Sequence, residues 1–236
     1  MQKIVIGKLK KLEYAAEEEY KSLRTNLQLC GKDVKIIGFT SCIPNEGKSS
    51  IVINIARTIA QGGKKVLIID ADMRKSVLVG RHRITKVAGG LSQLLSGFKE
   101  LDEVVCQTNV PNLFMVLAGP VPPNPSELLG SSGFKKFVKM AEERFDYVLI
   151  DCPPMGSVTD AAVVSQVCHG MCMVVTSNEI SSKFAARIKE QLDKTNCKIL
   201  GVILNKVKMK KGGYYGKYYG KYYGKYYGKK EEEADK

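Results

Sequence analysis

The chain has 236 residues, of which 44% are hydrophobic, and a formal net charge of +13 at pH 7. This is enough apolar material for one substantial core, and no apolar run approaches the roughly 18 residues of a membrane-spanning helix. The N-terminus lacks the apolar segment of a secretory signal peptide, so we expect a cytoplasmic protein. The basic balance favours anionic partners, namely nucleotide phosphates, an acidic membrane surface or nucleic acid.

The seven cysteines are scattered along the chain, and none belongs to a C-x-x-C pair. In a reducing compartment such cysteines behave as small buried hydrophobic residues. The run Cys168-His169-x-x-Cys172 raises a zinc site as an alternative, but no second ligand pair accompanies it, so this interpretation is disfavoured.

The first expected helix covers residues 14–27. Its apolar side chains recur at positions i, i+3 and i+7, which are Tyr20, Leu23 and Leu27. A second, charged face carries residues spaced three apart, which are Glu18, Lys21 and Arg24. Ordinary ion pairing on the helix surface is the favoured interpretation of this face, and pairing with a neighbouring subunit is the alternative.

A phosphate-binding loop is expected between residues 40 and 50. It follows an apolar run at 36–39, contains Gly47-Lys48-Ser49, and leads into a helical run that ends near Gln61. In such a loop the backbone N–H groups and a helix N-terminus face phosphate, a lysine adds positive charge, and a Ser hydroxyl can bind Mg²⁺. The match to G-x-x-x-x-G-K-[ST] is imperfect, because Cys42 takes the place of the first glycine. The residues expected to bind nucleotide are Pro44, Asn45, Glu46, Gly47, Lys48, Ser49 and Ser50.

Two later apolar runs end on acidic residues. Residues 65–69 lead to Asp70 and Asp72, and residues 146–150 lead to Asp151. Acidic groups at the carboxyl end of a buried strand point toward the crevice where α/β sheets bind ligands. Two carboxylates there repel each other unless a metal or a proton-accepting role uses them, so a functional interpretation is favoured.

The remaining elements alternate between strands and helices. Strands are expected at 113–117, 171–176 and 199–204, and helices at 89–97, 132–144 and 182–194. This alternation predicts an α/β fold of the P-loop NTPase type, with a mostly parallel central sheet and helices on both faces. The last strand ends on Asn205.

The sequence changes character near residue 207. Tyr-Tyr-Gly-Lys recurs in four copies and acidic residues follow, a composition that cannot build a core and predicts a disordered C-terminal tail. The chain is therefore divided into an N-terminal helical segment (1–33), a P-loop nucleotide-binding domain (34–206) and a Tyr-rich tail (207–236). The tail tyrosines are Tyr214, Tyr215, Tyr218, Tyr219, Tyr222, Tyr223, Tyr226 and Tyr227.

Three motifs together with the tail resemble one family. The three motifs are the loop Pro44-x-x-Gly47-Lys48-Ser49, the run from Ile68 to Arg74, and the run from Leu149 to Pro154. They look like the Walker A, A′ and B motifs of the bacterial tyrosine kinases (BY-kinases) of capsular and exopolysaccharide synthesis. The tail matches that family's autophosphorylation cluster. Glu18-x-x-Lys21-x-x-Arg24 is similar to its oligomerisation motif, with lysine where the family usually has arginine, and lysine cannot make the bidentate contact of arginine.

The resemblance implies an ATP- and Mg²⁺-dependent protein tyrosine kinase that phosphorylates the tail of a neighbouring copy. It further implies a homo-oligomer, with a ring as the expected form, and a cognate tyrosine phosphatase. The chain looks like the cytosolic half of a split kinase, recruited to the inner face of the membrane by a separate membrane-bound activator with a cytoplasmic segment. No nucleic-acid partner is expected.

The same resemblance assigns roles in phosphoryl transfer, where positioning and charge neutralisation dominate. Lys48 would bridge the β- and γ-phosphates, and Asp70 would accept or steer the tyrosine proton, although an aspartate of pKa ~4 and a phenol of pKa ~10 are about six units apart. Asn205 would contact adenine, as in related P-loop ATPases. The expected Mg²⁺ ligands are Ser49, Asp72 and Asp151.

Two other functions are weaker alternatives. A partitioning or septum-positioning ATPase would carry K-G-G-x-G-K-[ST], whereas this chain has Ile43 at the early lysine and Pro44-Asn45 at the two glycines. A nucleic-acid binder could use the interleaved tyrosines and lysines, but the tail lacks arginine and the Mg²⁺–ATP residues would remain unexplained.

Overall fold

The computed structural model describes residues 2–9, 12–87 and 89–207. Apart from residue 207, the predicted tail, with all eight of its tyrosines, lies outside these described residues. Residues Met1–Asn205 belong to one compact unit, so the N-terminal 33 residues share a unit with the P-loop region that follows them.

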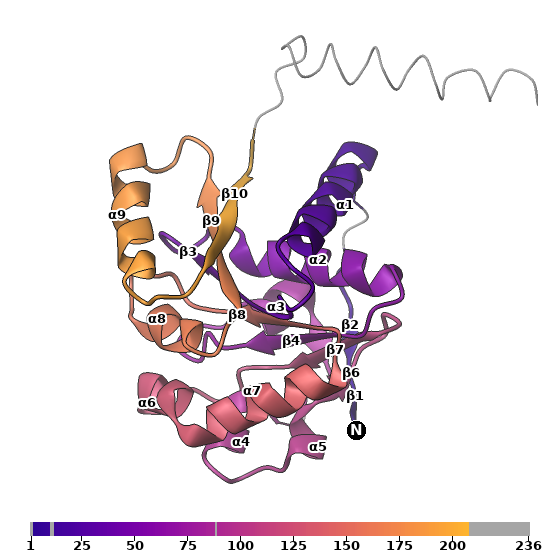
Figure 1. Ribbon diagram of the computed structural model, residues 1–236. Helices are drawn as coiled ribbons and strands as arrows, with labels where there is room; N and C mark the ends of the chain where they lie inside the picture. The colour runs from indigo at the N-terminus through magenta and orange to yellow at the C-terminus, as the bar shows by residue number, and fades with distance from the viewer. Residues whose placement is uncertain (1, 10–11, 88, 208–236) are drawn as a thin grey trace, which may run out of the picture. The chain divides into compact units, whose positions relative to one another are not determined.

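The centre of this unit is an eight-stranded sheet in the order β1-β6-β7-β4-β8-β3-β9-β10 (Figure 1). Its six main strands run parallel to one another, and they are β3 (Ile36–Ser41), β4 (Val66–Asp70), β7 (Leu113–Val116), β8 (Tyr147–Asp151), β9 (Gly170–Thr176) and β10 (Ile199–Asn205). At one edge, β6 (Cys106–Gln107) is antiparallel to β7 and β1 (Gln2–Lys3) pairs with β6. The predicted mostly parallel sheet is therefore confirmed.

Helices cover both faces of the sheet, as the alternating elements predicted. The four longer ones are α1 (Tyr14–Leu29), α2 (Lys48–Gln61), α7 (Ser132–Arg144) and α9 (Ser182–Asp193). The shorter ones are α3 (Leu78–His82), α4 (Leu91–Leu95), α5 (Leu101–Val104), α6 (Pro125–Gly130) and α8 (Asp160–Ser165). A small second sheet pairs β2 (Val5–Ile6) with β5 (Ile84–Thr85).

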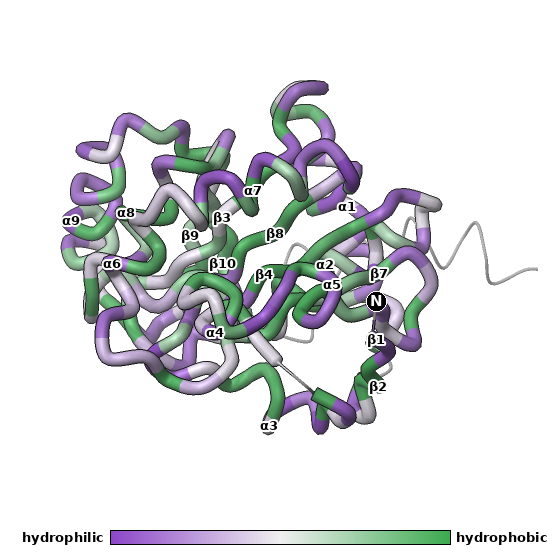
Figure 2. Tube along the Cα trace, turned by 90° about the horizontal axis from the view of Figure 1, so that it is seen from below, coloured by the Kyte–Doolittle hydropathy of each residue, from purple (hydrophilic) through white to green (hydrophobic). Residues whose placement is uncertain are grey.

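Each face of the sheet has its own core. Ile37, Phe39 and Ile68 pack with α1, α2 and the N-terminal strands, whereas Leu67 and Ile150 pack with the helices α4 to α9. Because successive strand residues point to opposite faces, strands buried on both sides must be apolar throughout. Figure 2 shows this pattern, with hydrophobic residues on the central strands and hydrophilic residues on the outer turns of the helices.

Candidate active site

The carboxyl ends of three neighbouring strands meet at one edge of the sheet. Asp70 at the end of β4 is the register partner of Asp151 at the end of β8, and Phe39 of β3 pairs with the same Asp151. Strand β3 continues into the predicted phosphate loop, which leads into α2. This edge is where parallel α/β sheets bind their ligands.

A pocket of about 190 Å³ opens at this edge. Its lining contains six of the predicted nucleotide-binding residues, Pro44 through Ser49, together with Asp72. Asp70 and Asp151, which are almost completely buried, are not among the lining residues. The remaining predicted positions, Ser50 and Asn205, also do not line it.

Lys48 begins α2 and connects the loop to Asp151. Its Nζ donates a hydrogen bond to Asp151 Oδ1 and lies 3.5 Å from Ser49 Oγ. Burial on its own would lower the pKa of Lys48, but the Asp151 carboxylate outweighs it and raises that pKa. Lys48 therefore stays charged where phosphates would bind.

Asp70 is fully buried and contacts the pocket-lining residue Asp72. Its carboxylate accepts hydrogen bonds from the Ser76 hydroxyl and from the backbone N–H of Asp72, the latter at 3.3 Å. Burial, and then the neighbouring charge of Asp151, raise the pKa of Asp70 to about 7. This pKa is about three units closer to that of a phenol than the pKa of an ordinary aspartate is. The difference of about six pKa units expected from the sequence is therefore about halved.

The three predicted metal ligands, Ser49, Asp72 and Asp151, offer one hydroxyl and two carboxylates. Oxygen donors of this kind suit Mg²⁺, which usually keeps several waters and takes further ligands from substrate phosphates. Burial raises the pKa of Asp72, and the Lys48 charge opposes that rise. Over the described ranges 2–9, 12–87 and 89–207, no group of three or more His, Cys, Asp or Glu side chains could hold a metal by itself. The donor set therefore fits an ion shared with phosphate, and does not form a closed structural site.

The phosphate loop is held from inside by Glu46. One carboxylate oxygen accepts hydrogen bonds from the N–H groups of Cys42 and Ile43 at 2.6 and 2.9 Å, and the other accepts from Thr176 N–H at 2.9 Å. The Glu46 carbonyl in turn accepts a bond from Asn205 Nδ2 at 2.7 Å. Sequence analysis placed Glu46 and Asn205 against nucleotide, whereas in the structure both side chains bond to the loop and its supports. The sequence did contain one indication of this arrangement: an acidic residue in an anion-binding loop would repel phosphate unless its side chain were bonded to the protein.

A second network was missed because its members are far apart in sequence. The Arg74 guanidinium donates two hydrogen bonds to Asp160, at 2.8 and 3.0 Å, and a third to Ser126 Oγ at 2.9 Å. Burial would raise the pKa of Asp160, but the bonds from Arg74 and Ser126 outweigh it and hold that pKa below its usual value. The network ties the loop after β4 to α6 and α8.

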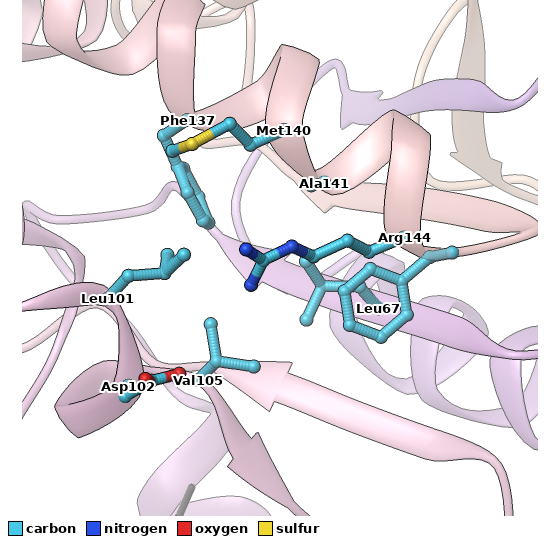
Figure 3. A pocket seen from close by; sticks show the side chains of 9 residues that line it. Leu67, Leu101, Asp102, Val105, Phe137, Met140, Ala141 and Arg144 are labelled. Atoms are coloured by element: carbon cyan, nitrogen blue, oxygen red, sulfur yellow. The ribbon is translucent and has the colours of Figure 1, made fainter.

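Another pocket lies between α5 and α7, away from these residues (Figure 3). It is apolar, with Leu101 and Phe137 among its lining, and the Asp102 and Arg144 side chains lie on opposite sides of it. Its volume of about 30 Å³ accommodates one or two water molecules, so it is a packing gap and not a nucleotide site.

The predicted oligomerisation residues lie along α1. Lys21 is paired with Glu18 at 2.7 Å, and Arg24 donates a hydrogen bond to the Thr58 carbonyl of α2 at 3.1 Å. At least one of the three side chains therefore holds α1 against its own domain. In the part of the chain that the structure describes, no helix is both long and apolar enough to cross a membrane.

The strand–loop–helix unit with its lysine and its two acidic strand ends defines a P-loop NTPase, a fold that binds a nucleotide with a divalent metal. A family model described as an AAA domain matches residues 34–199. The tyrosine-protein kinase CpsD of Streptococcus agalactiae is 41% identical over 211 residues, which cover 89% of this chain and 92% of that protein. The tyrosine-protein kinase YwqD of Bacillus subtilis is 38% identical, covering 84% and 87%.

Among solved structures, the chimerical protein CapA2B2 matches with a TM-score of 0.79 and 32% identity, covering 87% of this chain and 95% of that one. The chain belongs to the family of bacterial tyrosine-protein kinases of capsule synthesis, and it is a protein-tyrosine kinase. The family resemblance seen in the sequence is therefore confirmed.

Proposed function

We propose that this kinase uses Mg²⁺·ATP at the loop pocket and phosphorylates the tyrosines of its own tail in a neighbouring copy. The observation that carries the proposal is the meeting of Lys48, Asp70 and Asp151 at one sheet edge, next to a pocket that Lys48 and Asp72 line. A basic group for phosphate, carboxylates for a metal and a buried carboxylate for a proton are the parts that phosphoryl transfer needs.

Each residue of the proposed site has its own role in phosphoryl transfer. Lys48 leaves Asp151 and contacts the β- and γ-phosphates, while the N–H groups at the start of α2 face the phosphate oxygens. Mg²⁺ neutralises charge on the nucleotide and would be held by Ser49, Asp72 and Asp151. Asp70 takes the proton of the tyrosine hydroxyl, and its raised pKa makes it a stronger base than an exposed aspartate. Asn205 borders the loop, and we infer that its amide also limits where the adenine lies.

Incubation with Mg²⁺ and ATP, followed by a phosphotyrosine blot, tests the proposal. The wild-type chain should be labelled, whereas Lys48→Met and a chain that ends at Lys211 should not. Mixing these two variants supplies an active site on one molecule and tyrosines on the other, so label should return on the full-length Lys48→Met chain. Label on Lys48→Met alone contradicts the site, and no label in the mixture contradicts transfer between copies.

We further infer the partners that the family resemblance implies: a membrane-bound activator with a cytoplasmic segment, a cognate tyrosine phosphatase, and a homo-oligomeric ring of cytoplasmic chains at the inner membrane face. Support for the oligomer comes from the charged face of α1, where Glu18 and Lys21 are partly exposed. Charge reversal at Glu18 should lower the sedimentation coefficient of the assembly. An unchanged coefficient would remove α1 from the interface.

A further inference from the structure

We infer that Glu46 is a positioning residue for phosphoryl transfer, which acts by fastening the phosphate loop to strands β9 and β10 and does not itself touch the nucleotide. The inference rests on the proposed use of this loop for ATP. It assigns to one acidic side chain the task of shaping the loop before any ligand arrives.

The contacts of Glu46 are unusual for a residue in an anion-binding loop. Its side chain is buried at 1% exposure, and both carboxylate oxygens are taken up by backbone N–H groups. Two of these donors, Cys42 and Ile43, start the same loop, and the third, Thr176, ends strand β9. The three N–H donors satisfy both carboxylate oxygens, so the cost of burying these polar atoms is compensated.

The same residue is held through its backbone. The Glu46 carbonyl accepts bonds from Asn205 Nδ2 at 2.7 Å and from Thr176 Oγ1 at 3.3 Å. The loop is therefore fixed by the last residues of two neighbouring parallel strands. The next residue, Gly47, begins the turn into α2 with φ of 89°.

This arrangement decides which N–H groups can serve a phosphate. The N–H groups of Cys42 and Ile43 donate to Glu46. Phosphate would therefore be bound by the N–H groups of the later part of the loop and of the first turn of α2, which have no intrahelical partner. A negative charge this close to phosphate would repel it, but here the three bonds direct that charge toward the protein interior. Loss of the fastening should therefore weaken ATP binding more than the chemical step.

The decisive variant is Glu46→Gln. Glutamine keeps the shape but offers one acceptor oxygen, and its NH₂ group would face an N–H donor, so at least one of the three bonds is lost. We expect KM for ATP to rise about 10- to 100-fold while kcat at saturating ATP stays within about 3-fold. Amide hydrogen exchange, measured without nucleotide, should accelerate at residues 39–48 and 173–178 and stay unchanged at β4.

Glu127→Gln is the matched control, because Glu127 is exposed on α6, where its carboxylate accepts a hydrogen bond from the exposed Asn124. A Glu46→Gln protein with wild-type KM, or with a lower melting temperature and no local change in exchange, overturns the inference. If that variant does not fold, Thr176→Val provides the test, because it removes the hydroxyl bond to the Glu46 carbonyl. A raised KM for ATP in Thr176→Val supports the inference, and an unchanged KM overturns it. Failure of the wild-type chain to bind ATP would instead overturn the proposed function, and the exchange measurement separates the two cases.

Discussion

The ammonium group of Lys48 and the carboxylate of Asp151 form a buried ion pair, although 103 positions separate them in sequence. The two residues are only 6% and 1% exposed. Each charge compensates the burial of the other, and both are required at the proposed site. Removing one of them affects folding as well as chemistry.

Lys48→Met should therefore lower stability in addition to abolishing kinase activity. The substitution leaves the Asp151 carboxylate buried without its cation, which costs about 3–5 kcal/mol. Urea unfolding monitored by circular dichroism measures this cost. The double variant Lys48→Met with Asp151→Asn should regain part of the lost free energy of unfolding, because it has no buried charge without a partner at this position. A double variant as unstable as the sum of the two single variants would contradict the pairing.

Asp70→Asn should reduce kcat about 10²- to 10⁴-fold, the range expected when a general base is lost. Asparagine can still accept the bond from Ser76, so the pocket should keep its shape and KM for ATP should stay near the wild-type value. Steady-state phosphorylation of a tyrosine peptide across an ATP series separates the two constants. A change in KM alone would place Asp70 in nucleotide binding instead.

Acid should weaken the fold partly through Asp160. The bonds from Arg74 and Ser126 hold the pKa of Asp160 below its ordinary value in the folded chain, so its carboxylate stabilises the protein above about pH 4, and that contribution is lost as the pH falls through the folded pKa. Asp160→Asn should be less stable than wild type at pH 7 by roughly 1–2 kcal/mol, a figure reduced by the exposure of Arg74. Melting curves from about pH 7 down to about pH 2.5 should show the two proteins converging in acid. A constant difference over that range would be the contrary result.

Gly47→Ala should raise KM for ATP at least about tenfold, because two effects combine at this position. The residue has φ of 89°, and a Cβ there would lie 2.2 Å from Asn205 Nδ2. Gly63 provides a matched control, since its φ is 83° and a Cβ at that position would have nothing within 4 Å. Gly63→Ala should cost about 1 kcal/mol in stability with unchanged kinetics. Equal kinetic losses in both variants would assign the effect to backbone strain alone.

Much of the fold was predictable because the strands are buried on both faces. Runs such as 66–69 and 148–150 are apolar throughout, and the acidic residues that end them mark the functional edge of the sheet. Strands β1, β2, β5 and β6 were missed because each has two residues, too few for any periodicity. The six loop residues that line the pocket, Pro44 to Ser49, were also found, because the loop is continuous in sequence.

The supporting contacts could not be predicted because they join distant positions. Thr176 and Asn205 reach the loop across 130 and 159 residues, and Arg74 meets Asp160 across 86. Nothing in the composition around Thr176 or Ser76 distinguishes them from other strand-end or turn residues. Tertiary packing alone brings these partners together.

The order of the strands also has a consequence for the growing chain on the ribosome. Strand β3 and its loop are made early, but β3 lies between β8 and β9, and the loop is fastened by residues at the ends of β9 and β10. A nascent chain that stops before Asn205 therefore lacks a finished phosphate loop, although the loop itself was synthesised long before. We expect partly made chains to be unable to hold nucleotide, so that kinase activity begins only after translation of the whole domain.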